Sequence, residues 1–297
     1  MTNIYDRLDL DALGIDKTKF RDKGKKSISL GIDLEEKACG FLQEKFIEEG
    51  NRPYFAKQFA QAISGDGNEL MKMDAAKSSS LCSLLFFYNL ADEDGRRLTI
   101  EGITYTRSFF EYKNKVYRNP SNMDVVLTNA EGDILFVECK FSEYFERDDS
   151  PTISATYFTD ERSAGLMGYL VEQGILRKGK KDAYTAYYGG ERIHATGLKQ
   201  IVAHYVGIGH FLAGDYPKEQ YGDDRDLIKD IPNKKVRFIE VLFDLGEELK
   251  NYKDASDALI AHISKPDQFL QSTTYQAILS ENPQYKLDEM VKKYYRY

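Results

Sequence analysis

Tryptophan is absent from this 297-residue chain, and cysteine and proline are scarce, with three and seven residues. The cysteines are Cys39, Cys82 and Cys139, an odd number without CxxC or Cys/His spacing. We therefore expect reduced thiols, and neither a disulfide framework nor a structural zinc site. Reduced thiols are typical of cytoplasmic proteins, so we expect a cytoplasmic localisation.

Long apolar runs are also missing. No stretch of about 18 consecutive apolar residues occurs, so the sequence predicts no membrane span and no membrane partner. The acidic N-terminal segment lacks the continuous apolar region of a signal peptide. Without repeats, low-complexity tracts or a Pro/Gly/Ser-rich linker, the chain is expected to form one elaborated domain.

Positive charge is outnumbered, because 41 Lys and Arg stand against 48 Asp and Glu for a net charge of −7. Such a chain is not a general polyanion binder, and nucleic-acid binding needs a local basic face. One short basic run, with Arg177 before it, offers candidate nucleic-acid contacts at Lys178, Lys180 and Lys181. A second run is Lys234, Lys235 and Arg237. A solvated loop is the alternative for each.

Hydrophobic periodicity predicts the elements. Apolar residues recur at helical spacing over five stretches, at about 33–50, 53–63, 79–90, 162–173 and 197–214. β-branched and aromatic residues predict four strands, at about 100–111, 123–128, 134–141 and 236–245. The short turn NAEGD joins the second strand to the third and predicts a hairpin. A helix between the last two strands indicates a crossover and a parallel pair.

These elements predict an α/β fold with a mixed central sheet and helices on both faces. We expect an N-terminal arm over residues 1–30 and a core over 31–246 with insertions at about 50–95 and 145–190. Residues 247–297 are expected to be a helical C-terminal extension of the same domain.

One segment, NPSNMDVVLTNAEGDILFVECKFSEYF at 119–145, places charges on an otherwise apolar hairpin. Alternate residues of a strand share a face, so Glu138 and Lys140 lie together while Cys139 faces the core. Asp124 begins the partner strand, and a hairpin brings the start of one strand to the end of the other. We therefore expect Asp124 near Glu138 and Lys140, where buried charges must pair or bind a metal.

Two carboxylates and a lysine suit a hard cation such as Mg²⁺ or Mn²⁺. Such a metal stabilises charge on a phosphate and lowers the pKa of bound water, which is the chemistry of phosphodiester hydrolysis. Glu-x-Lys also begins at Glu35, Glu111 and Glu248. The first and last fall in expected helices, and Glu111 has no Asp at the head of a paired strand, so we expect a decoy there.

Asp124 followed by Glu138-Cys139-Lys140 across a hairpin resembles the active-site motif of the PD-(D/E)xK nuclease superfamily. The segments GDGNEL, SSSL, CKFSEYF and KQIVAHYVGI, at 65–70, 78–81, 139–145 and 199–208, resemble those of uncharacterised restriction-endonuclease-like proteins. The resemblance covers most of residues 35–245. It implies a core of helix, three strands, helix and strand, and a metal-dependent nuclease that acts on nucleic acid, with DNA as the expected substrate.

The resemblance also assigns roles. Asp124, Glu138 and the backbone carbonyl of Cys139 would ligate Mg²⁺, for which Mn²⁺ would substitute, and Lys140 would position the attacking water. Gln200 would support the site from the following helix. Restriction-type enzymes often dimerise to cut both strands, so a homodimer stays open.

The resemblance implies a further acid on the first helix. At about 100° per residue, Glu35 falls between Leu42 and Phe46 on the inward face, whereas Glu36 points away. Glu35 is therefore our candidate. The alternative is that both acids only favour the N-terminus of the helix.

His204 lies one turn after Gln200 and on the same face. It would position phosphate or water, and the alternative is a packed histidine with a satisfied hydrogen bond. The other histidines have no partner at ligand spacing, and we interpret them as structural or surface residues.

Two other functions stay open. The chain could be a non-catalytic nucleic-acid or protein-binding module on the same fold, although the intact Asp/Glu/Lys trio favours an enzyme. A phosphohydrolase acting on small esters is the third, and neither a Gly-rich phosphate loop nor a His-rich cluster supports it.

Overall fold

We describe a computed structural model of the chain. The described residues are 4–20, 27–32, 37–65, 68–90, 96–116, 120–142, 152–179, 183–188, 191–192, 198–218, 221–263 and 268–297.

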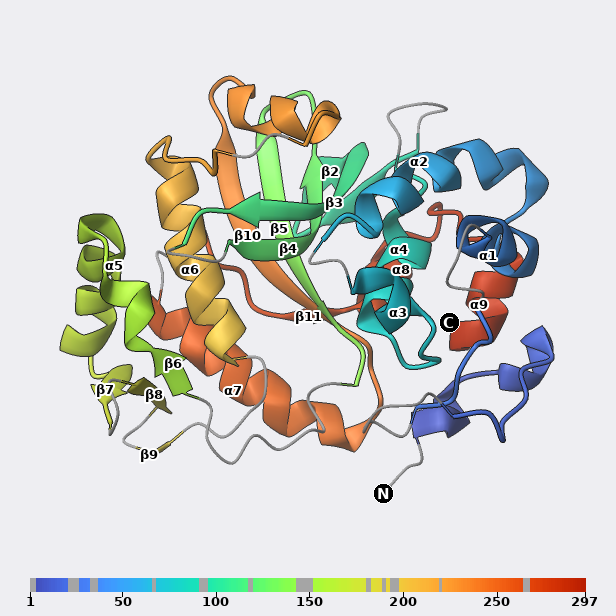
Figure 1. The fold of residues 1–297 in the computed structure, drawn as a ribbon, viewed down its shortest axis with the longest axis horizontal. Helices are drawn as coiled ribbons and strands as arrows, with labels where there is room; N and C mark the ends of the chain where they lie inside the picture. Colours follow the sequence, from blue (N-terminus) through green and yellow to red (C-terminus); the bar gives the residue numbers. More distant parts are fainter. Residues whose placement is uncertain are drawn as a thin grey trace.

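A five-stranded mixed sheet lies at the centre (Figure 1). In spatial order its strands are β11 (Thr273–Thr274), β10 (Lys235–Leu242), β5 (Asp133–Lys140), β4 (Ser121–Thr128) and β3 (Arg107–Asn114). β3, β4 and β5 pair antiparallel, whereas β10 runs parallel to β5 and to β11. The α/β class, the hairpin and the parallel crossover pair are confirmed.

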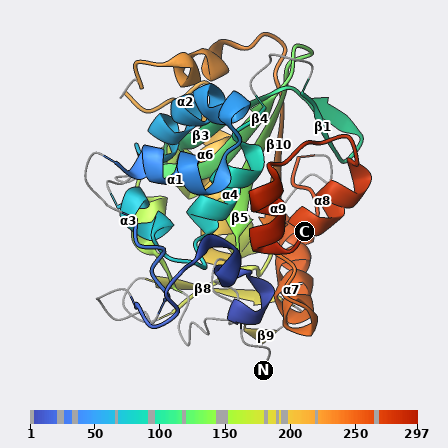
Figure 2. The same ribbon diagram turned by 90° about the vertical axis from the view of Figure 1, so that its right-hand side faces the viewer.

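Helices cover both faces of the sheet (Figures 1 and 2). One face is covered by α1 (Ala38–Phe46), α2 (Arg52–Ala62), α3 (Glu69–Met73), α4 (Ser79–Phe87), α8 (Tyr275–Glu281) and α9 (Glu289–Tyr295). The other is covered by α5 (Glu161–Glu172) and α6 (Leu198–Leu212). The long α7 (Glu247–Ile263) contributes buried residues to both sides.

Shorter elements complete the described chain. The 3-10 helices are Ile4–Arg7, Leu10–Leu13, Glu49–Asn51, Ala155–Phe158 and Asp224–Asp230. The remaining strands are β1 (Leu98–Ile100), β2 (Ile103–Tyr105), β6 (Thr152–Ser154), β7 (Leu176–Lys178), β8 (Ala183–Tyr188) and β9 (Glu191–Arg192). The last four form a small sheet beside α5, at the lower left of Figure 1.

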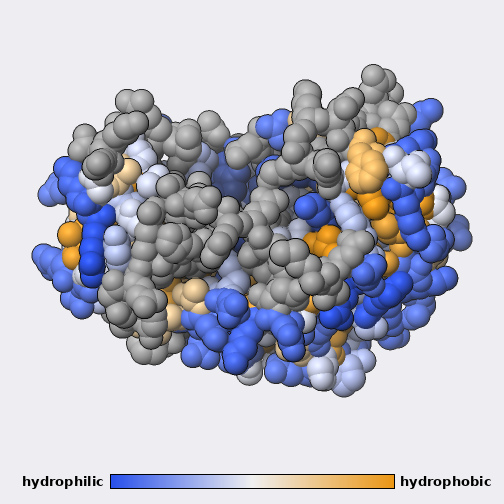
Figure 3. Space-filling model, turned by 90° about the horizontal axis from the view of Figure 1, so that it is seen from below, coloured by the Kyte–Doolittle hydropathy of each residue, from blue (hydrophilic) through white to orange (hydrophobic). Residues whose placement is uncertain are grey.

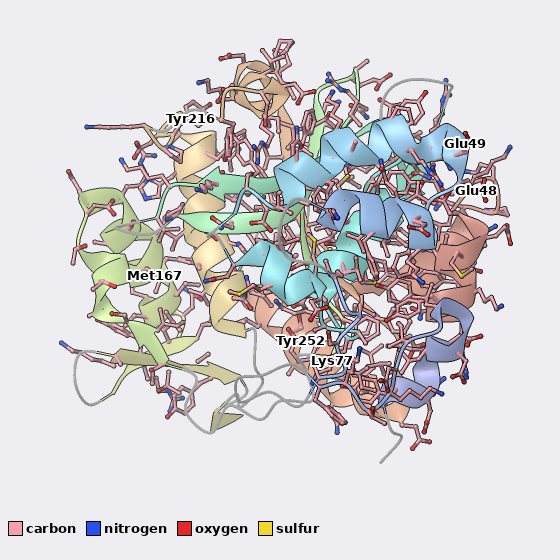
Figure 4. All side chains as sticks on the ribbon, turned by 45° about the vertical axis from the view of Figure 1, so that its right-hand side comes forward. Glu48, Glu49, Lys77, Met167, Tyr216 and Tyr252 are labelled. Carbon is pink, nitrogen blue, oxygen red and sulfur yellow. The ribbon has the colours of Figure 1, made fainter. Side chains whose placement is uncertain are left out.

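The central strand β5 divides the hydrophobic core in two. Phe136 packs in the cluster beneath α5 and α6, which includes Met167 of α5, labelled in Figure 4. Val137 and Cys139 pack in the opposite cluster with α1, α2 and α4. Every residue of β5 is buried, as expected for a strand covered on both faces. Full burial of one large apolar side chain contributes roughly 1.5–3 kcal/mol, so both faces hold this strand firmly.

Several expected elements agree with the structure to within a few residues. They are the helices now seen as α2, α4, α5 and α6, the strands β4, β5 and β10, and a largely helical C-terminal segment. The expected start of the first helix at Asp33 lies outside the described residues. All three cysteines are free thiols.

The expected single strand over 100–111 is wrong. Glu101 and Gly102 adopt positive φ values of 49° and 73° and reverse the chain between β1 and β2. β3 then begins at Arg107 as a separate strand. The helix α3, the small sheet at 152–192 and the short β11 were also not expected.

The N-terminal segment is packed against the body of the protein. Leu8 and Leu10 are buried, and the amide of Asp9 donates to the carbonyl of Tyr294 in α9 (2.8 Å). Lys17 and Lys19 of this segment are exposed, and Lys17 pairs with Asp11.

In the described part of the chain, no helix combines the length and the apolar character needed to cross a membrane. The face seen from below is mainly hydrophilic where residues are described, and apolar residues gather in smaller areas of it (Figure 3).

A glycine on α6 lets this helix approach the sheet closely. A Cβ on Gly207 would lie 2.9 Å from Cβ of Asn114 on β3 and 3.4 Å from Cβ of Ser121 on β4. We expect Gly207→Ala to lower the free energy of unfolding by about 1–3 kcal/mol through overpacking. Gly165→Ala on α5 is the matched control, because a Cβ there meets open space and should stabilise the helix by up to about 1 kcal/mol. Urea denaturation of both variants measures the difference, and equal effects would contradict this packing.

Candidate active site

Four acidic residues fall in one row across the central sheet. Glu240 of β10 pairs with Glu138 of β5 in the parallel register. The antiparallel registers place Asp124 of β4 beside Glu138, and Glu111 of β3 opposite Asp124. Carboxylates on adjacent strands repel one another unless cations or hydrogen-bond donors intervene. The partners of these acids therefore define the site.

Glu138 is 1% exposed and has charged or polar partners on both oxygens. Lys140 Nζ donates to Glu138 Oε1, and also to Oε1 of Gln200 at 2.9 Å. Nε2 of His204 lies 2.9 Å from Glu138 Oε2. Burial alone would raise the pKa of Glu138, but Lys140 and His204 outweigh it and lower that pKa to about 2. Glu138 is therefore ionised at neutral pH.

His204 belongs to the interior. It is 2% exposed, and its Nδ1 lies 2.6 Å from Oγ of Ser121. A direct contact of His204 with phosphate or nucleic acid does not fit this burial. The alternative, a packed histidine with satisfied hydrogen bonds, does fit, because its ring bridges β4 to Glu138. Gln200, by contrast, is exposed and holds Lys140 from the open side of the site.

Asp124 is half-buried beside this network. Its Oδ2 accepts a hydrogen bond from the backbone amide of Cys139 at 2.7 Å, which fixes β4 against the end of β5. The expected proximity of Asp124 to the Glu-x-Lys segment is confirmed. The Cys139 side chain packs on the opposite face, where burial raises the pKa of the thiol, so its interpretation as a core residue holds.

Glu111 was expected to be a decoy, and the structure instead places it at the site. Its φ is 53°, a conformation that side chains other than glycine adopt at a cost in free energy. The strand alternation breaks here, because Phe109 and Tyr112 both pack in the α5–α6 cluster. Burial, and then the negative charges of Asp124 and Glu69, raise the pKa of Glu111 to about 9. Glu111 is therefore protonated at neutral pH in the metal-free protein.

The strained backbone at Glu111 is held from both sides. Gln61 of α2 accepts from the amide of Phe110 (3.2 Å), and Arg225 donates to the carbonyl of the same residue (3.0 Å). A Cβ on Gly65 would lie 2.5 Å from Oε2 of Glu111, so a larger residue there would displace this side chain. The sequence did contain a signal for this neighbour. Glu111 and Asp124 lie equally far along the chain from the middle of the β3–β4 connection, so an antiparallel pair places them opposite each other.

Helix α3 adds a carboxylate and a lysine that the sequence analysis did not identify. Glu69 is 3% exposed, accepts from Lys72 Nζ, and accepts from Oγ of Ser80 at 3.1 Å. Burial would lower the pKa of Lys72, but the carboxylates of Glu69, Glu111 and Asp124 outweigh it and raise that pKa. Lys72 therefore lies within electrostatic reach of the site opposite Lys140.

Glu240 is separate from the site in its hydrogen bonding. Tyr252 and Ser256 of α7 donate to its two oxygens at 2.6 and 2.7 Å, and Figure 4 labels Tyr252. Burial raises the pKa of Glu240 to about 7. These hydroxyl donors anchor α7 beneath the sheet.

Some expected residues are not placed at the site. Glu35, Lys180 and Lys181 lie outside the described residues. Lys178 is exposed on β7, in the small sheet. In the second basic run, Lys234 donates to the hydroxyl of Tyr216 (3.1 Å), so one of its charges serves the fold.

A second hydrogen-bonded group has the composition of a serine hydrolase triad. Oγ of Ser163 lies 2.9 Å from Nε2 of His210, whose Nδ1 lies 2.8 Å from Oδ2 of Asp215. Ser163 and His210 are both 0% exposed, so no substrate reaches the hydroxyl. The group joins α5 to the end of α6, which agrees with the structural role expected for His210.

Negative charge exceeds positive charge at the site. Four carboxyl groups face two lysines: Glu69, Glu111, Asp124, Glu138, Lys72 and Lys140. Within the described ranges, no three or more His, Cys, Asp and Glu side chains stand close enough to hold a metal ion by themselves. Two carboxylates with water molecules suit Mg²⁺, which usually keeps several waters. The donor chemistry therefore fits a hard cation.

Comparison of the chain with protein-family models, with curated proteins and with solved structures found no match. The chemistry of the site consequently has to be inferred from its own residues.

Replacing Glu111 tests the charge excess. Its folded pKa of about 9 lies above the ordinary value of 4.5. The stability that the protonated carboxyl contributes is full below pH 4.5 and is lost as the pH rises toward 9. We expect the isosteric Glu111→Gln to be more stable than wild type by on the order of 2 kcal/mol at pH 8 in EDTA, and equal to it near pH 4.5.

The measurement is urea denaturation across this pH range. Glu101→Gln is the matched control, because Glu101 also has a positive φ but is exposed, so its substitution should change stability at neither pH. A pH-independent difference at position 111 would mean that ionisation of the carboxyl does not set the stability difference.

Proposed function

We propose that this protein is a metal-dependent nuclease with a restriction-endonuclease-like core, which hydrolyses phosphodiester bonds with DNA as the expected substrate. The observation that carries the proposal is the placement of Asp124, Glu138 and Lys140 on the adjacent strands β4 and β5. Asp124 accepts from the amide of Cys139, between Glu138 and Lys140, and Lys140 donates to Glu138 and to Gln200. This trio stands on the rigid centre of the sheet, where catalytic groups can be held in place.

The order of elements supports the same proposal. Helices precede three antiparallel strands, β3 to β5, and α6 then crosses over to β10, which runs parallel to β5. This is the order of helix, three strands, helix and strand that the resemblance implies. Fold alone does not establish chemistry, so the proposal depends on the site.

Asp124 and Glu138 are the residues that would hold Mg²⁺, with the backbone carbonyl of Cys139 as a further ligand. When bound, the metal would neutralise charge on the scissile phosphate and lower the pKa of a water molecule. Each carboxylate oxygen of Glu138 already has one partner, Lys140 or His204. A carboxylate oxygen accepts more than one partner, so room for a metal remains. Ligation therefore does not require the buried pair to break.

Lys140 orients the attacking water and stabilises charge that develops on the phosphate. Its ammonium is fixed between Glu138 and Gln200, and this arrangement limits its motion before the substrate binds. Lys72, with a half-exposed side chain, can contact the phosphate from the α3 side. His204 keeps Glu138 in position, because it joins that carboxylate to Ser121.

Replacement of Lys140 tests the reaction. We expect Lys140→Ala to lower cleavage of linear, supercoiled, single-stranded or branched DNA, or of RNA, by about 100-fold or more in Mg²⁺ or Mn²⁺. Gln200→Ala should lower cleavage less, because the ammonium of Lys140 keeps its hydrogen bond to Glu138. Lys250→Ala is the matched control, since it belongs to another Glu-x-Lys segment, on α7. Circular dichroism must show that the Lys140 variant is folded, because Glu138 loses a buried partner.

Metal binding separates an enzyme from a binding module on the same fold. We expect Mn²⁺ to bind wild type stoichiometrically in calorimetry and to raise its melting temperature, because it offsets the excess carboxylate charge. Asp124→Asn keeps the size of the side chain, removes its charge, and should abolish both effects. A wild type that neither binds Mn²⁺ nor cleaves any substrate would favour the non-catalytic binding module.

A further inference from the structure

A cavity of about 520 Å³, lined by polar and charged residues, lies apart from the acidic site. Its walls come from the end of α4, the β1–β2 hairpin and the segment before α9, with Asn89, Arg96, Arg97, Thr99, Thr104 and Lys286 among the lining residues. Asn129, directly after β4, donates to the carbonyl of Thr104 (3.0 Å). Asp124 lies toward the other end of that strand, about 17 Å away at the usual rise per residue.

The cavity concentrates positive charge in a protein whose net charge is −7. Three of its lining residues are cationic, and no carboxylate belongs to the described lining. Arg97 and Lys286 are exposed, and no side-chain hydrogen bond or ion pair joins either of them to the described part of the chain. Surface cations normally have anionic neighbours, so this arrangement leaves charge available for a ligand.

Neutral contacts hold the cavity in shape. The guanidinium of Arg96 donates to Oδ1 of Asn51 (2.7 Å) and stacks over the ring of Tyr54 (5.0 Å). The amide of Asn89 donates to the carbonyl of Lys286 (2.6 Å), and the hydroxyl of Tyr285 lies 2.6 Å from Oδ1 of Asn89. None of these contacts neutralises a cation. The guanidinium of Arg96 is thus preorganised, and ordering it on binding costs little.

We infer that this cavity binds a phosphate-bearing anion, carried either by a free nucleotide or by nucleic acid. Guanidinium groups match the geometry of phosphate oxygens. The three cations can balance more negative charge than one carboxylate carries, which favours a phosphate-bearing ligand over a simple carboxylate. The volume is in the range of small-molecule sites, so it accommodates more than one phosphate group. The inference does not depend on hydrolysis at the acidic site.

Calorimetry in EDTA tests the cavity while the proposed metal site is inactive. The probes are inorganic pyrophosphate, ADP and a short single-stranded oligodeoxynucleotide. We expect pyrophosphate to bind, and Arg97→Ala/Lys286→Ala to weaken its binding by about tenfold or more. Both residues lie at the surface, so this variant should melt like wild type. Lys250→Ala removes a charge outside the cavity and should bind pyrophosphate normally.

The arms of the experiment identify the source of the phosphate. Competition between pyrophosphate and the oligonucleotide indicates a nucleic-acid backbone, and binding of ADP without the oligonucleotide indicates a free nucleotide. No binding of any probe, or equal binding by the double variant, would overturn the inference.

A further control tests the acidic residues that directly precede Arg96 in the sequence. Asp92, Glu93 and Asp94 precede Arg96 and lie outside the described residues. A variant with all three changed to amides should bind pyrophosphate at least as well as wild type. If only this variant bound, the chain's own acids would be occupying the cavity, and the inference would fail.

Discussion

Glu138 is an ionised carboxylate buried in the middle of the sheet, and its need for partners constrains the surrounding structure. An unpaired charge there would cost several kcal/mol, more than most single contacts contribute. Lys140, from the same strand, and His204, from the crossover helix, supply the compensation. The position of α6 over the sheet and the chemistry of the site therefore depend on the same contacts.

The site retains features that work against stability. Glu111 combines a positive φ with a buried, protonated carboxyl, and both cost free energy. Gln61 and Arg225 hold this backbone in place from elements far apart in the sequence. Strain that the surrounding structure maintains in this way is typical of functional sites. The basic cavity near the other end of β4 has the opposite charge, so the protein separates an acidic centre from a cationic surface.

Much of the sheet was predictable, because strand alternation is a local property. The faces of β5, the hairpin to β4 and the proximity of Asp124 to the Glu138–Lys140 segment all follow from period-two spacing and one short turn. The expected strand over 100–111 failed at Glu101 and Gly102, where a positive φ reverses the chain. The expectation for Glu111 gave it no Asp on a paired strand, whereas Asp124 stands opposite it on the following strand.

The sequence by itself determined which residues alternate on β5, where most of the longer helices lie and which three charged residues the β4–β5 hairpin carries, because these depend on neighbours within a few residues. Only the tertiary structure decided that Glu111, Glu69 and Lys72 join them and that His204 is buried against Glu138. It also assembled a cationic cavity from the chain near Arg96 and from Lys286, which lie far apart in sequence. The physical reason is that burial, charge coupling and close approach depend on packing between distant segments, which local periodicity does not encode.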